Sequence, residues 1–146
     1  MGCSTKIGGD AGSQADVEAG TSACEVDTRD EPYVSGMEKT GGSVIVQFTS
    51  ANPAPPAKGS NVWTLKVLRG ADRSPLSGAK VVVTPFMPDH GHGASGTPVI
   101  DDKGDGSYEV RDIYLSMPGY WRTTVSVTPS GESTPSEVQF HLCLDG

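Results

Sequence analysis

The sequence predicts an all-β domain of about seven antiparallel strands, a sandwich or a barrel, behind a disordered N-terminal leader. After residue 43, short runs rich in Val, Ile, Thr and aromatic residues alternate with clusters of Gly, Pro, Asn and Asp. No segment of useful length has the periodicity of an amphipathic helix. Residues 4–23 combine Gly, Ser, Ala and acidic side chains with few apolar ones, so they cannot bury enough surface to offset the entropy of ordering.

The length of 146 residues suits one domain with a real hydrophobic core, so we assign residues 1–23 to a flexible acidic leader and residues 24–146 to the domain. Pro32 argues against a helix through the middle of the segment 24–40, which we expect to be irregular and loosely packed. Residues 85–96 are expected to form a loop.

Alternation of apolar residues places the strands and their buried faces. Trp63, Leu65 and Val67 share one face of the second strand, and Trp121 lies on the buried face of the sixth. The third strand is nearly continuously apolar, which suits a central position in a sheet. The expected strands are residues 44–49, 62–68, 79–84, 97–100, 107–113, 120–128 and 137–142.

The net charge of −7 is concentrated in the N-terminal part of the chain. Residues 1–31 hold seven acidic residues against Lys6 and Arg29, which leaves about −2 for the rest. No cluster of Lys and Arg provides the positive surface that nucleic acid or an anionic membrane requires, so neither is an expected partner. No apolar run approaches the roughly 18 residues needed to span a bilayer.

Two of the three cysteines, Cys24 and Cys143, bracket the predicted domain. A disulfide between them would close a loop of roughly 120 residues and stabilise the fold by about 4–5 kcal/mol through the entropy of the unfolded chain. It would also indicate an oxidising compartment. The alternative is that both are free or buried thiols.

The opening Met1-Gly2-Cys3-Ser4 resembles a bacterial lipoprotein cut near its signal-peptidase site, with a new start methionine added. This resemblance implies that Cys3 carries the lipid and that the leader tethers the domain, so that a lipid anchor is the expected membrane contact. The alternative is a chance cysteine in a low-complexity leader.

The candidate metal ligands lie in residues 85–93, where Met87, His90 and His92 occur within six residues. A thioether is a soft ligand that favours Cu(I), and imidazole suits copper in either oxidation state, so this combination selects copper over hard cations. Met117, which precedes a second proline at the end of a neighbouring strand, could supply another sulfur. The alternatives are methionines that fill the core and a solvated His-Gly-His loop.

Other candidate sites are weak. His141 alternates with Phe140 and is expected at the surface or at a sheet edge. Asp101, Asp102 and Asp105 do not have the spacing of a calcium-binding loop and fit a hairpin turn better. No nucleophile can be paired with a base, so an enzyme is not expected.

Several of these segments together resemble the YtkA-like/FixH-like domain over roughly residues 43–142. The resemblance implies a small immunoglobulin-like antiparallel β-sandwich, exported or membrane-tethered, with a role in copper handling that includes maturation of copper oxidases. Its recurrent motifs fall on the ligands already selected, Met87, His90, His92 and Met117. The acidic leader, Cys24 and Cys143 are additions to the family pattern. The matching segments are residues 61–65, 78–81, 87–93, 106–108 and 115–121.

We therefore expect an exported, non-catalytic protein that buffers or delivers copper, located in the periplasm or tethered to the outer membrane. Cu(I) is the favoured form and Cu(II) is also compatible, and the expected partners are the copper ion and a copper-protein client. The alternative is a structural or interaction module without metal, in which the same loop is a rigid rim that contacts another protein.

Overall fold

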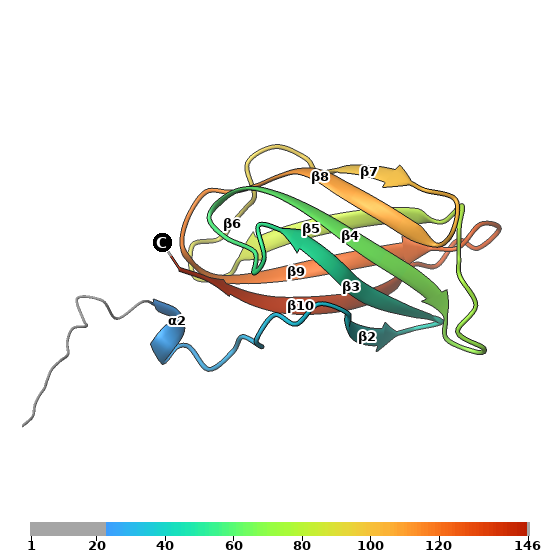
Figure 1. Cartoon of the computed structure of the whole chain (residues 1–146), viewed down its shortest axis with the longest axis horizontal. Helices are drawn as coiled ribbons and strands as arrows, with labels where there is room; N and C mark the ends of the chain where they lie inside the picture. The colour runs from blue at the N-terminus through green and yellow to red at the C-terminus, as the bar shows by residue number, and fades with distance from the viewer. Residues whose placement is uncertain (1–22, 146) are drawn as a thin grey trace, which may run out of the picture.

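The computed structural model describes residues 23–145, and in it two antiparallel sheets pack face to face as a β-sandwich (Figure 1). One sheet has the strand order β10-β9-β5-β6 and the other the order β2-β3-β4-β8-β7. The elements are α2 (Ala23–Val26), β2 (Met37–Gly41), β3 (Val44–Asn52), β4 (Gly59–Arg69), β5 (Lys80–Met87), β6 (His92–Gly93), β7 (Val99–Asp102), β8 (Ser107–Leu115), β9 (Gly119–Thr128) and β10 (Ser136–Leu144).

All seven expected strands are present, which confirms the predicted sandwich class. The expectation for residues 24–40 was wrong, because they contain the single turn α2 and the strand β2, which pairs with β3 from Met37 opposite Phe48 to Gly41 opposite Val44. Residues 85–96 are also not a plain loop, since β5 extends to Met87 and β6 pairs with its end. In both cases pairing with a neighbouring strand overrides a weak local signal.

The position expected for the third strand needs a similar correction. β5 pairs with β9 along its length, but on its other side only Phe86 and Met87 pair with β6. Its side chains accordingly alternate, with Val81 and Val83 buried and Val82 43% exposed. The apolar run therefore belongs to a strand whose outer edge is largely open.

The core between the sheets is built around aromatic side chains, and both tryptophans are fully buried in it as expected. The Phe48 ring lies 5.0 Å from Trp63 in the same sheet and 5.4 Å from Phe140 in the opposite sheet, measured between centroids. Tilted and edge-on contacts of this kind favour one arrangement of the rings. The contact between Phe48 and Phe140 therefore helps to fix how the two sheets pack on each other.

The N-terminal segment is fixed to β10 rather than loosely packed. Cys24 forms a disulfide with Cys143, as the sequence led us to expect. Further along, Glu31 N donates to His141 O at 3.0 Å, and His141 N donates to the Glu31 carboxylate at 3.1 Å. The segment between α2 and β2 is therefore attached to β10 at two points, Cys24 and Glu31.

The leader expected at residues 1–23, with Cys3, lies outside the described residues apart from Ala23. Between residues 23 and 145, no helix is long and apolar enough to cross a membrane.

Candidate metal centre

The loop with the two histidines is folded back onto the end of β5. The amides of His90 and Gly91 both donate to Met87 O, at 3.2 and 2.8 Å. Gly91 has a φ of +68°, which favours glycine because a β-carbon is strained there. The turn pairs His92 directly with Met87, and directly opposed residues of antiparallel strands point to the same face.

The second methionine lies at the corner between β8 and β9. Trp121, buried in the core, donates its indole N–H to Met117 O at 3.0 Å and so holds the corner in place. Gly119 has a φ of +123°, and a β-carbon there would lie 3.1 Å from Met87 Cε. A glycine at this position lets the side chain of Met87 approach the corner that carries Met117.

These elements bring His92 and Met117 into contact, with His92 Nε2 3.3 Å from Met117 Sδ. The other ring nitrogen, Nδ1, lies 3.0 Å from Gly93 O. A carbonyl oxygen only accepts hydrogen bonds, so in the tautomer that bonds Gly93 O the proton is on Nδ1 and Nε2 keeps a lone pair, whereas in the other tautomer Nε2 donates to the sulfur. In the tautomer with the proton on Nδ1, the lone pair of Nε2 faces the lone pairs of Met117 Sδ. This arrangement suits a cation that both atoms bind.

The other two predicted ligands flank this pair. His90 is exposed, and its ring centroid lies 5.8 Å from that of His92. Met87 is only 1% exposed and belongs to the hydrophobic core. The His92 ring meets Trp121 edge-on at 6.0 Å, so the site has an apolar floor and opens on the side of His90. His141, predicted at the surface or at a sheet edge, is half-buried on the edge strand β10, and its Nδ1 lies 2.7 Å from the Tyr120 hydroxyl.

We also searched the described residues for clusters of the other common metal-binding side chains. In the described part of the chain, no group of three or more His, Cys, Asp or Glu side chains is arranged to hold a metal ion. A metal centre at the end of β5 therefore depends on methionine sulfur, and that favours a soft ion.

One charged contact to the loop was not predicted. Arg29 of the N-terminal segment donates to both oxygens of Asp89, at 2.9 and 2.7 Å. The guanidinium lowers the pKa of the Asp89 carboxyl, and pairing with Asp89 and Asp27 raises the pKa of Arg29. No local signal in the sequence links residues 60 positions apart, so this contact could be found only from the structure.

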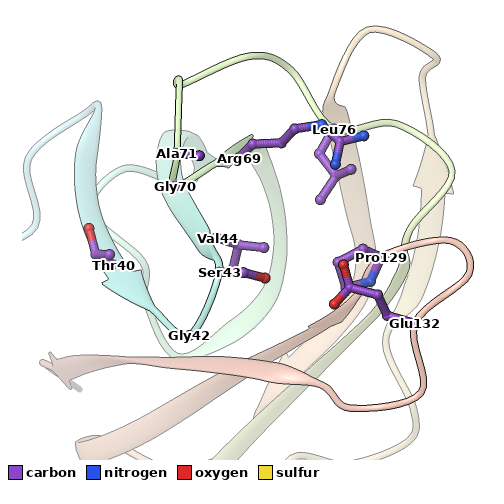
Figure 2. A pocket seen from close by; sticks show the side chains of 10 residues that line it. All are labelled: Thr40, Gly42, Ser43, Val44, Arg69, Gly70, Ala71, Leu76, Pro129 and Glu132. Atoms are coloured by element: carbon purple, nitrogen blue, oxygen red, sulfur yellow. The ribbon is translucent and has the colours of Figure 1, made fainter.

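A surface hollow of about 400 Å³ lies at the opposite end of the sandwich (Figure 2). Gly42 and Ser43 line it from the turn between β2 and β3, Val44 from the start of β3, and Arg69 from the end of β4. Its lining contains no Met, His or Cys, so it offers no soft metal ligand.

The fold and this cluster define a small β-sandwich with a methionine and histidine site at one end. The sequence profile of the YtkA-like family matches residues 41–126, more than half of the chain, and the protein therefore belongs to the YtkA-like family. A comparison with functionally curated proteins finds no match.

Among solved structures, the chain is similar to a copper-bound variant of FetP from uropathogenic Escherichia coli strain F11. The two share 13% sequence identity with a TM-score of 0.51, and the match covers 77% of this chain and 96% of that chain. At this identity the likeness shows a shared fold.

Proposed function

We propose that this protein is a non-catalytic copper-binding protein of the cell envelope that buffers or delivers copper through its methionine and histidine site. The observation that carries the proposal is the approach of His92 Nε2 to Met117 Sδ at 3.3 Å, two atoms that are both ligands for a soft metal ion. Two candidate ligand atoms from different strand ends are thus brought together.

The spacing of these two atoms suits a shared metal ion. With bonds of about 2.0 Å to nitrogen and about 2.3 Å to sulfur at a tetrahedral angle, the two ligand atoms lie roughly 3.5 Å apart. The observed 3.3 Å is close to that separation, so little movement is needed on binding. Thioether sulfur with imidazole selects copper, and Cu(I) in particular.

We assign the four residues different parts in the site. His92 and Met117 are the preformed pair. Met87 approaches from the buried side, on the same face of β5 and β6 as His92. His90 completes the site from the exposed turn, where ligand exchange with another protein could begin.

Two further observations support the proposal. FetP, which has this fold, has been solved with copper bound. The disulfide between Cys24 and Cys143 suits an oxidising compartment such as the periplasm. We include in the proposal that Cys3 is the lipid-bearing residue and that a copper protein is the client.

The test is a competition titration of Cu(I) with a chromophoric chelator, in a Cys3→Ser background so that the free thiol does not bind the metal. We expect the greatest loss of affinity from His92→Ala and Met117→Leu, since these remove the preformed pair. Met37→Leu is the control, because it removes a methionine on β2 outside the proposed ligand set. Weak binding that is equal in the wild type and in the His92→Ala/Met117→Leu variant would reject the proposal and favour a metal-free interaction module.

A further inference from the structure

A bidentate ion pair joins the loop with the proposed metal ligands, residues 87–93, to the N-terminal segment. Arg29 Nη1 and Nη2 donate to Asp89 Oδ1 and Oδ2 at 2.9 and 2.7 Å. Asp89 sits in the tight turn between Met87 and His90, next to a proposed ligand. Paired hydrogen bonds between a guanidinium and a carboxylate fix orientation as well as distance. A shift of Arg29 would therefore be transmitted to the turn.

Arg29 is itself held on its other sides. Its Nε and Nη2 donate to the Asp27 carboxylate at 3.1 and 2.7 Å. Its Cζ lies 4.1 Å from the centroid of the Tyr120 ring on β9, within range of a cation–π contact. Asp27 is mostly buried, with 12% of its side chain exposed, whereas the pair with Asp89 is half-exposed. The guanidinium is thus seated against β9 and presents two N–H groups to the loop.

The backbone around Arg29 is tethered on both sides. Five residues before it, Cys24 is bonded to Cys143. Two residues after it, Glu31 exchanges main-chain and side-chain hydrogen bonds with His141. Both tethers end on β10, so the position of Arg29 depends on a covalent link that a reductant can open.

We propose that Arg29 is the positioning residue of the metal loop, and that the Cys24–Cys143 disulfide influences copper affinity through it. The inference rests on the proposed function. When a dithiol reduces the disulfide, two electrons and two protons pass to the cysteines, giving two thiols, and the dithiol becomes a disulfide. Of the two tethers to β10, the segment then keeps the one at Glu31, so Arg29 leaves Asp89 more often and the loop holds its histidines less firmly.

The expected effect is moderate because the Arg29–Asp89 pair is half-exposed. Such pairs change an equilibrium constant by up to about fivefold. We therefore expect copper affinity to fall by about that factor when the pair is broken.

The first experiment needs no copper. Amide hydrogen exchange is measured at His90 and Gly91, whose N–H groups bond Met87 O, in metal-free wild type and Arg29→Ala. We expect about threefold to fivefold faster exchange in the variant. The control is Arg73→Ala, which breaks an equally two-armed pair with Glu38 and should leave exchange in the loop unchanged. Unchanged exchange in Arg29→Ala would overturn the inference.

The second experiment measures Cu(I) affinity in the Cys3→Ser background, under a reductant that leaves the disulfide intact. The variants are Arg29→Ala, Arg29→Lys, which keeps the charge without the paired hydrogen bonds, and Cys24→Ser/Cys143→Ser, which opens the link without adding thiols that bind Cu(I). We expect Arg29→Ala and Cys24→Ser/Cys143→Ser each to weaken Cu(I) binding. In the combined variant, the fold-loss of affinity should be smaller than the product of the two separate fold-losses. Arg29→Lys should lose less affinity than Arg29→Ala, because a positive charge remains beside Asp89.

The outcomes separate the two proposals. A wild-type protein that binds no copper overturns the proposed function. A wild-type protein that binds copper, with an affinity that neither Arg29→Ala nor Cys24→Ser/Cys143→Ser changes, overturns this inference alone. Fully independent effects of the two changes would show that the disulfide does not act through Arg29, and would also overturn it.

Discussion

Opening the Cys24–Cys143 disulfide should lower the stability of the fold strongly. The two cysteines are 119 residues apart in sequence. For a loop of that length, the entropy lost by the cross-linked unfolded chain corresponds to about 5 kcal/mol at 25 °C. This is a large part of the 5–15 kcal/mol typical of a whole domain. In a domain of this size, we expect the thermal midpoint to fall by roughly 15 °C or more.

The assay is urea unfolding followed by tryptophan fluorescence, with Cys24→Ser/Cys143→Ser compared with the disulfide-bonded protein, both in the Cys3→Ser background. Since the entropic effect lies in the unfolded state, the serine variant should also expose more surface on unfolding and show a steeper dependence on urea. Thiol counting on the unfolded Cys3→Ser protein gives the control and should find no reactive thiol. A loss below about 1 kcal/mol with an unchanged slope would refute this reasoning.

Three further predictions concern single groups and the pH. Hydrogen bonds from Arg73 and Gln47 lower the pKa of Glu38 to about 2, so its stabilising contribution is present above its ordinary value of 4.5 and is lost as the pH falls through about 2. An NMR titration should show this, and a midpoint near 4.5 would contradict it. Gly119→Ala should destabilise the fold by about 1–3 kcal/mol in urea unfolding, because a β-carbon is strained at this φ and crowds Met87 Cε; an unchanged midpoint would refute this. Cu(I) affinity should weaken between about pH 7.5 and pH 5, since protons compete for imidazole but not for a thioether, and replacing both histidines should flatten the dependence.

The sheet architecture was largely predictable because most strands alternate cleanly between buried and exposed residues. Trp121 and Val125 on β9, like Val138 and Phe140 on β10, follow this period and are buried. The strand β6 could not be predicted, because its two residues carry no periodicity. β2 was missed for a related reason, since its residues are at most half-buried and their pairing with β3 is a tertiary interaction.

The composition of the candidate site was easier to predict than its geometry. The residue types in the loop indicate a soft metal, but the contact between His92 and Met117 exists because the corner before β9 folds over the end of β5. The burial of Met87 likewise depends on how the two sheets pack. The role proposed for Arg29 could not be read from the sequence at all, since it depends on the disulfide that fixes the N-terminal segment against β10.

The central claim is that one copper ion is bound by both imidazole and thioether, and X-ray absorption spectroscopy of the Cu(I)-loaded Cys3→Ser protein tests it most directly. We predict nitrogen scatterers at about 2.0 Å and sulfur scatterers at about 2.3 Å, with the sulfur contribution reduced in Met117→Leu and the nitrogen contribution reduced in His92→Ala. A spectrum fitted by nitrogen and oxygen alone, and unchanged in Met117→Leu, would contradict the account.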